Sequence, residues 1–136
     1  MTPFAGIRAV LFDFDGTLTR PGGLDFAAIR RALGCPPGAS ILAFIDSLPS
    51  EEERAEARSK LDAFEMEAAA RARPNRDAEE VVRALRRQGF LLGIFSRNSR
   101  RAILRSLQNF NSICAEDFTV ILSREDTPLP KPAPDG

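Results

Sequence analysis

Two aspartates separated by one residue, Asp13 and Asp15, are the side chains in this sequence best suited to chemistry. They follow an apolar run at residues 7–12 that predicts a buried strand. Carboxylates just past the end of a parallel strand lie at the crevice where α/β sheets bind ligands. Gly16 then lets the chain turn and aim backbone N–H groups at one point, which would suit an anion. The simple alternative is an ordinary Asp-Gly turn after a strand.

Ser96, Arg97 and Asn98 form a second polar group, placed after the apolar run at residues 90–95. A hydroxyl at the point where a buried strand gives way to a helix can bind a phosphate oxygen together with the free N–H groups of that helix. Arg97 and Asn98 offer further hydrogen-bond donors. The alternative is that Ser96 only caps the helix and that Arg97 points to solvent.

Lys131, which lies between two prolines near the end of the sequence, is the third candidate. A phosphate monoester dianion repels a carboxylate, so an aspartate nucleophile needs cations and hydrogen-bond donors close by. Lys131, the N–H groups around Gly16, Ser96 and a Mg²⁺ would supply them. A lysine among prolines is otherwise a solvated loop residue.

These three groups, in this order, resemble the motifs of the haloacid dehalogenase (HAD) superfamily. The stretch from Asp13 to Thr19 reads Asp-Phe-Asp-Gly-Thr-Leu-Thr and resembles motif I of the phosphatase branch, with a nucleophilic first aspartate and a second one that acts as general acid and base. Ser96 resembles motif II. Lys131 resembles motif III, in which a Lys-Pro pair holds the cation against nucleophile and phosphate. The presence of Asp15 favours phosphate esters over haloacids, because displacement of a halide needs no proton.

The resemblance implies a Mg²⁺-dependent phosphatase similar to phosphoglycolate phosphatase-like members, with a small phosphorylated metabolite as substrate. Asp13 would attack phosphorus and form an aspartyl-phosphate, and Asp15 would protonate the leaving alcohol and then deprotonate a water. Thr17 is expected to orient Asp15. Asp13 and the backbone carbonyl of Asp15 would bind Mg²⁺. The residues expected to bind the substrate phosphate are Gly16, Thr17, Ser96, Arg97 and Asn98.

The family has a fourth motif, an acidic pair that completes the Mg²⁺ site, and this sequence has no stretch resembling it before Gly136. We therefore expect a truncation, a fragment or one half of an assembly, with weakened Mg²⁺ binding. In the family the missing strand lies beside the first strand, so residues 9–12 would form an exposed edge through which the chain self-associates. A phosphomutase of the same family and a catalytically silent phosphate-binding module stay open as other functions.

The elements around these residues predict an α/β fold, with a Rossmann-like parallel sheet of three strands and a small all-helical cap inserted after the first strand. Strands are expected at 7–14, 90–95 and 119–122, and the order of strands and helices is that of a parallel sheet with crossover helices. The sheet region would comprise residues 1–20 and 74–136. The cap would comprise residues 21–73, between proline-containing hinges at 20–23 and 73–76.

Helices are expected at 24–34, 40–48, 50–73 and 77–89, followed by one around 103–107. Their predicted features are ends at Gly34 and Gly89, caps at Ser50 and Asp77, and inward-facing Val81, Val82 and Leu85. The third helix carries many charges that are expected to face solvent. Its Arg54, Arg58 and Lys60 are candidates to contact a charged substrate, and the pattern selects none of them.

Composition excludes several classes of function. The 136 residues are 43% apolar, enough for one domain with a core, and the 19 acidic and 19 basic residues leave no net charge to recruit nucleic acid or an anionic membrane. Cys35 and Cys114 fit no metal or redox spacing and are expected to be reduced thiols. The sequence shows neither a signal peptide nor a membrane-spanning segment, so we expect a cytoplasmic protein.

Overall fold

The computed structural model describes residue 6 and residues 8–126 of the chain. Its sheet consists of β1 (Ala9–Phe12), β2 (Leu91–Phe95) and β3 (Val120–Leu122), and the strand order is β1-β2-β3. Both pairs of neighbouring strands are parallel. The predicted α/β fold with a parallel three-stranded sheet is therefore confirmed.

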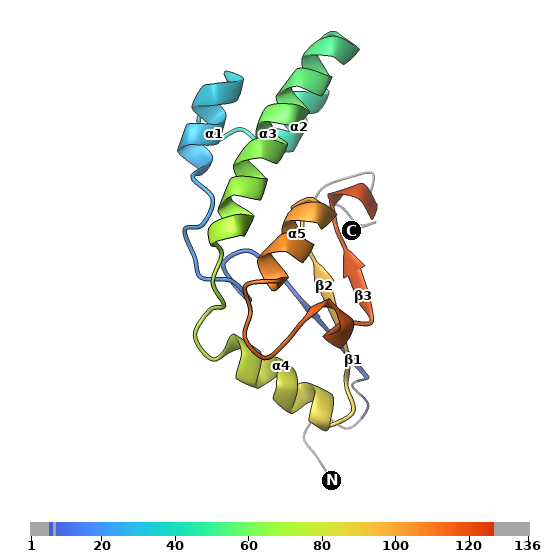
Figure 1. The fold of residues 1–136 in the computed structure, drawn as a ribbon. Helices are drawn as coiled ribbons and strands as arrows, with labels where there is room; N and C mark the ends of the chain where they lie inside the picture. Colours follow the sequence, from blue (N-terminus) through green and yellow to red (C-terminus); the bar gives the residue numbers. More distant parts are fainter. Residues whose placement is uncertain (1–5, 7, 127–136) are drawn as a thin grey trace.

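Three helices separate β1 from the rest of the sheet region: α1 (Phe26–Leu33), α2 (Ile41–Asp46) and α3 (Glu51–Arg71). We call them the cap helices. The chain then forms α4 (Ala78–Arg87) before β2 and α5 (Arg100–Leu107) after it, and short 3₁₀ helices, η1 (Ala115–Asp117) and η2 (Arg124–Asp126), flank β3. Figure 1 shows the cap helices gathered beyond one end of the sheet, with α3 running down towards α5.

One face of the sheet carries the main hydrophobic core. Alternate strand residues on this face, including Leu92, Ile94 and Ile121, pack with Val82 of α4 and Ile103 of α5. Leu92 is 2% exposed and Ile94 is fully buried. Both crossover helices therefore cover the same side of the sheet, which accounts for the alternation of more and less exposed residues along β1.

The opposite face of the sheet is open among the described residues. Leu11 and Leu91 are each 56% exposed and Val120 is 41% exposed, although the sequence predicted strands buried on both faces. That prediction is wrong for this face because α4 and α5 both lie on the other one. β1 is also an edge strand in the described sheet, as predicted.

Most of the predicted helix boundaries are confirmed. Gly34 ends α1 in the left-handed conformation at φ 75°, and the Ser50 side chain accepts the Glu53 N–H at 3.0 Å at the start of α3. Asp77 is the N-cap residue of α4 as predicted, but it has φ 65° and its side chain makes no capping hydrogen bond. The prediction that Val81 faces inward is wrong: Val81 is 47% exposed, because the inward stripe of α4 runs through Ala78, Val82 and Leu85.

The cap helices enclose a hydrophobic cluster of their own. Its buried members come from all three helices and the loop after α1: Ile29, Cys35, Ile41, Ile45, Ala57 and Leu61. The two segments that join the cap helices to the sheet region lie side by side, with an antiparallel bridge between Thr19 and Pro74 and an Arg20 N–H donating to the Arg73 carbonyl at 3.0 Å. The predicted hinge segments are thus hydrogen-bonded to each other.

Helix α3 links the two regions. Its buried residues, Ala57, Leu61, Glu65 and Ala69, recur every four positions and form one stripe. At its C-terminal end the Asn109 amide donates to the carbonyls of Ala69 and Ala72 at 3.0 Å each, which satisfies acceptors that the end of a helix leaves open. Among the described residues no helix is long and apolar enough to cross a membrane.

Candidate functional site

A cavity of about 340 Å³ lies between the sheet region and the cap helices. The sheet region lines it with Asp13, Asp15, Ser96, Arg97, Asn98 and Arg124. The cap side is mostly apolar, with Leu24, Phe26, Ile41, Leu42 and Leu61, and adds the polar residues Arg30, Ser40 and Glu65. The carboxyl ends of adjacent parallel strands meet at one edge of a sheet, which is why Asp15 and Asn98, 83 positions apart in sequence, share this space.

The turn after β1 is held by internal hydrogen bonds. The carbonyl of buried Phe14 accepts N–H groups from Thr17, Leu18 and Thr19 at 3.2, 2.9 and 3.1 Å. Gly16 adopts φ 81°, which favours glycine, and its N–H donates to the Thr19 hydroxyl at 3.1 Å. The Gly16 and Thr17 amides, predicted to bind phosphate, are therefore used within the turn, and neither residue lines the cavity.

Asn98 holds the carboxylate of Asp15. Its Nδ2 donates to Asp15 Oδ2 at 3.1 Å, and its Oδ1 accepts the Ser99 N–H at 2.8 Å, which fixes which end of the amide faces the aspartate. Asn98 is 5% exposed, whereas Asp13 and Asp15 are exposed. Asn98, a residue predicted to contact the phosphate, therefore orients the Asp15 carboxylate, and the orienting role of Thr17 stays a prediction.

Ser96 is fixed at the end of β2 with its hydroxyl beside the cavity. Its N–H donates to the Leu122 carbonyl at 2.9 Å and its Oγ accepts the Asn98 N–H at 3.0 Å. Ser96 is 4% exposed, and no acceptor for its O–H proton is seen within residues 8–126. The hydroxyl can therefore donate to a ligand oxygen.

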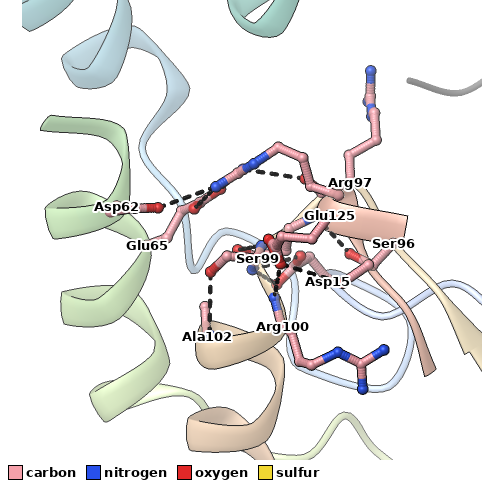
Figure 2. A network of polar contacts seen from close by, with 12 residues as sticks. Asp15, Asp62, Glu65, Ser96, Arg97, Ser99, Arg100, Ala102 and Glu125 are labelled. Atoms are coloured by element: carbon pink, nitrogen blue, oxygen red, sulfur yellow. Dashed lines mark hydrogen bonds and ion pairs between the residues drawn. The ribbon is translucent and has the colours of Figure 1, made fainter. Parts of the chain in front are cut away.

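The first N–H groups of α5 are less available to bind a phosphate oxygen than the sequence predicted. The Ser99 N–H donates to Asn98 Oδ1, the Arg100 N–H to Glu125 Oε1 at 2.8 Å, and the Ala102 N–H to the Ser99 hydroxyl at 3.2 Å (Figure 2). Glu125 belongs to η2, directly after β3. The start of α5 is therefore tied to the end of the neighbouring strand.

Arg97 extends away from this cluster of hydrogen bonds (Figure 2). Its side chain is exposed, lines the cavity and forms no ion pair within the described part of the chain. The arrangement fits a side chain that meets a ligand entering from the solvent side.

Sequence analysis missed an ion-pair cluster that joins Arg124 to the cap. Arg124 donates through both terminal nitrogens to Glu65 of α3, at 2.8 and 2.9 Å, and to Asp62 at 3.1 Å. Glu65 is 4% exposed. Burial raises the pKa of the Glu65 carboxyl, the hydrogen bonds and charge of Arg124 oppose that rise, and the charges of Asp62 and Asp15 add to it. A glutamate on the otherwise apolar stripe of α3 was the signal in the sequence.

The three cap cations singled out from the sequence lie on the surface of α3. Arg54 and Arg58 pair with Glu51 at 3.0 and 2.8 Å, and Lys60 lies 3.7 Å from Glu56. None of the three lines the cavity. In the described part of the cap, the base that does so is Arg30.

Lys131, predicted to be catalytic, lies outside the described residues. Within those residues no group of three or more His, Cys, Asp or Glu side chains could hold a metal ion. Asp13 and Asp15 still fit Mg²⁺ by their chemistry, because Mg²⁺ keeps several waters and takes only one or two carboxylates from a protein. Cys35 is buried, Cys114 is exposed, and both are free thiols.

The chain is similar in sequence to a curated protein. The chain is 35% identical over 130 residues to an uncharacterized hydrolase of Saccharomyces cerevisiae, and the match covers 95% of this chain and 59% of the yeast protein. The chain thus spans less than two thirds of the length of that curated relative.

Solved structures show the same fold. A haloacid dehalogenase-like hydrolase from Bacteroides fragilis superimposes with a TM-score of 0.72 at 23% identity, covering 96% of this chain and 69% of the other. CbbY from Rhodobacter sphaeroides, solved in complex with phosphate, gives a TM-score of 0.68 at 20% identity, covering 95% and 68%.

The family model for haloacid dehalogenase-like hydrolases matches residues 20–136. The match covers most of the chain and includes Ser96, Asn98 and Arg124 of the cavity. By this match, the chain belongs to the haloacid dehalogenase-like hydrolase family.

Proposed function

We propose that this protein is a Mg²⁺-dependent phosphatase that hydrolyses a small phosphate monoester through an aspartyl-phosphate on Asp13. The observation that carries the proposal is the shared cavity: Asp13 and Asp15 are exposed in the same space as the Ser96 hydroxyl, and Asn98 holds the Asp15 carboxylate at 3.1 Å. A nucleophile, a proton donor and a phosphate-oxygen donor together are what phosphoryl transfer requires.

In the first step, a carboxylate oxygen of Asp13 forms a bond to phosphorus while the bond from phosphorus to the alcohol oxygen breaks. The carboxyl group of Asp15 gives its proton to the leaving oxygen, so that a neutral alcohol departs. The Ser96 hydroxyl and the Arg97 guanidinium donate hydrogen bonds to the phosphoryl oxygens and offset their charge.

In the second step, a water oxygen attacks phosphorus and the bond between phosphorus and Asp13 breaks. Asp15, now ionised, takes a proton from that water, so the enzyme returns to its starting state and inorganic phosphate is released. Asn98 keeps the Asp15 carboxylate in one orientation through both steps.

A Mg²⁺ held by the Asp13 carboxylate and the backbone carbonyl of Asp15 would offset the repulsion between the Asp13 carboxylate and the phosphate dianion. Lys131, from the sequence resemblance, would add a further positive charge. We place the protein in the cytoplasm, where Cys35 and Cys114 stay reduced.

The test is the release of phosphate from p-nitrophenyl phosphate with Mg²⁺ present. We expect turnover by the wild-type chain and a loss of about a thousandfold or more in Asp13→Asn, because the nucleophile is removed. Asp46→Asn, which changes an exposed aspartate of α2 outside the cavity, is the matched control and should keep full activity.

The fate of the phosphoryl group separates this function from the alternatives. Phosphate found on a sugar acceptor instead of in solution would indicate a phosphomutase. A folded wild-type chain that binds phosphate without turning over any ester would contradict the proposal and favour a silent phosphate-binding module.

A further inference from the structure

Arg124 forms hydrogen bonds in two directions from the start of η2. Towards the cap helices, its terminal nitrogens donate to Glu65 at 2.8 and 2.9 Å and to Asp62 at 3.1 Å. Towards the sheet region, Nη1 donates to the Arg97 carbonyl at 3.2 Å, and the backbone N–H donates to the Asn98 carbonyl at 3.0 Å. Arg124 therefore joins the cap helices to the loop at residues 96–98.

The two cap carboxylates fix the plane of the Arg124 guanidinium. Its terminal nitrogens carry four N–H groups, and four oxygens accept from them: both of Glu65, one of Asp62 and the Arg97 carbonyl. A bidentate pair of arginine and carboxylate has a defined geometry, and Glu65 is only 4% exposed, so water competes little for it. The donor aimed at the Arg97 carbonyl is therefore held in place from the cap side.

Both peptide planes that flank Asn98 are fixed at their carbonyl and N–H ends. In the plane before it, the Arg97 carbonyl accepts from Arg124 and the Asn98 N–H donates to Ser96 Oγ at 3.0 Å. In the plane after it, the Asn98 carbonyl accepts from the Arg124 N–H, and the Ser99 N–H donates to Asn98 Oδ1 at 2.8 Å. Because peptide groups are planar, these two planes set the backbone dihedrals of Asn98 and the direction of its side chain.

We infer that Arg124 is a positioning residue: it holds the loop at residues 96–98 and, acting through Asn98, sets the orientation of the Asp15 carboxylate. The Asn98 amide donates to Asp15 Oδ2 at 3.1 Å, so a shift of the loop moves that donor away. This inference rests on the proposed function, in which Asp15 gives its proton to the leaving alcohol. The ion pairs on α3 then serve the reaction as well as the stability of the fold.

The test compares two esters that differ in how much they need the proton from Asp15. p-Nitrophenolate leaves as a stable anion, whereas propyl phosphate releases a poor leaving group that depends on the general acid. Arg124→Lys keeps the charge and loses the planar fork, and it should lower kcat/KM for propyl phosphate by about tenfold to a hundredfold. The value of kcat/KM for p-nitrophenyl phosphate should stay within about threefold.

A double-mutant cycle shows whether Arg124 acts through Asn98. Asn98→Ala should itself lower kcat/KM for propyl phosphate, and Arg124→Lys added to it should cost no more than about twofold further. Additive losses would mean that Arg124 acts by another route and would overturn the inference. The matched control is Arg71→Lys, at an exposed arginine of α3 that pairs with Glu67 outside the cavity, and it should change neither ester.

A paired replacement separates positioning from a loss of stability. Arg124→Met combined with Glu65→Leu removes both charges of the buried pair, and apolar side chains of similar volume often restore the stability that one substitution loses. The urea midpoint of this variant should lie close to that of the wild type, while kcat/KM for propyl phosphate stays about tenfold or more below it. Recovery of that activity together with the stability would overturn the inference.

Hydrogen exchange of the Asn98 side chain separates failure of this inference from failure of the proposed function. NMR of the ¹⁵N-labelled chain follows exchange of the two Nδ2 hydrogens with water and needs no turnover, and Asn98→Ala identifies their signals. Exchange about tenfold faster in Arg124→Lys and unchanged in Arg71→Lys supports the inference even if no ester is hydrolysed. Unchanged exchange in Arg124→Lys, with propyl phosphate turned over at the wild-type rate, would leave the phosphatase standing and overturn the inference.

Discussion

The sheet region and the cap helices contribute to one cavity in different ways. The sheet region supplies polar groups fixed by directional hydrogen bonds, such as Asn98 to Asp15 at 3.1 Å. The cap helices supply an apolar wall with Arg30 and Glu65. Reacting groups must be held within fractions of an ångström, and residues at the ends of strands can be positioned that precisely. A cavity wall that selects ligands needs only the right shape and charge.

The two regions also have separate hydrophobic clusters, one on the sheet and one among the cap helices. Polar links between them are concentrated at α3: the ion pairs of Arg124 with Asp62 and Glu65, and the hydrogen bonds from Asn109 to the end of the helix. These polar links add to the packing of α3 against α5 in holding the cap over the site, and the first of the following predictions tests the strongest of them.

Arg124→Ala should have the largest effect on stability. It leaves the buried Glu65 carboxylate without its bidentate partner, and breaking a buried ion pair in this way costs about 3–5 kcal/mol. Urea unfolding measures the loss. Arg71→Ala, which removes the exposed pair with Glu67, is the matched control and should cost no more than about 1 kcal/mol. Equal losses in the two variants would show that the link between the regions is no stronger than a surface pair.

Ile94→Ala and Ile29→Ala compare the two clusters directly, since both side chains are fully buried. Each change should cost about 2–5 kcal/mol in its own cluster. Native-state hydrogen exchange should show lost protection throughout the sheet region for Ile94→Ala and mainly in α1, α2 and α3 for Ile29→Ala. A uniform loss in both variants would mean that sheet region and cap unfold as one unit.

The pH dependence of stability should carry a contribution from Glu65. Its pKa is raised above the ordinary value of 4.5, so the folded chain keeps the proton in a range where the unfolded chain has released it. This contribution to the free energy of unfolding is fully present below pH 4.5 and is lost as pH rises through the raised pKa. Glu65→Gln should flatten this part of the profile, and Arg124→Ala should extend it to higher pH. A profile unchanged in Glu65→Gln would rule this contribution out.

We propose that the chain self-associates weakly through β1 and the open face of the sheet, where Leu11 and Leu91 are exposed. Leu11→Lys should shift sedimentation towards the monomer with little change in stability. Val81→Lys, at an exposed apolar residue of α4 on the covered side of the sheet, is the control and should leave association unchanged. Wild type that sediments as a monomer at all concentrations would contradict this proposal.

Local patterns predicted much of the fold. The spacing of apolar residues and the residues at helix ends, such as Gly34 and Ser50, placed the strands and helices within a few residues of their observed bounds. The predictions were wrong where the exposure of a side chain depended on how the helices pack against the sheet. Val81 faces solvent because the buried stripe of α4 is narrower than the set of apolar residues in its sequence. Leu11 is exposed because both crossover helices cover the other face of the sheet.

In the candidate site, too, some features were predictable from the sequence and others were not. That Asp13, Asp15, Ser96 and Asn98 would lie together followed from the sequence alone, because each comes directly after a strand and parallel strands bring their carboxyl ends to one edge. The pairing of Glu65 with Arg124, 59 residues apart, and the place of Arg30 on the cavity wall were decided only by the tertiary structure. Those contacts depend on how the cap helices pack against the end of the sheet region, and a periodic pattern within one helix contains no information about the partner it will meet.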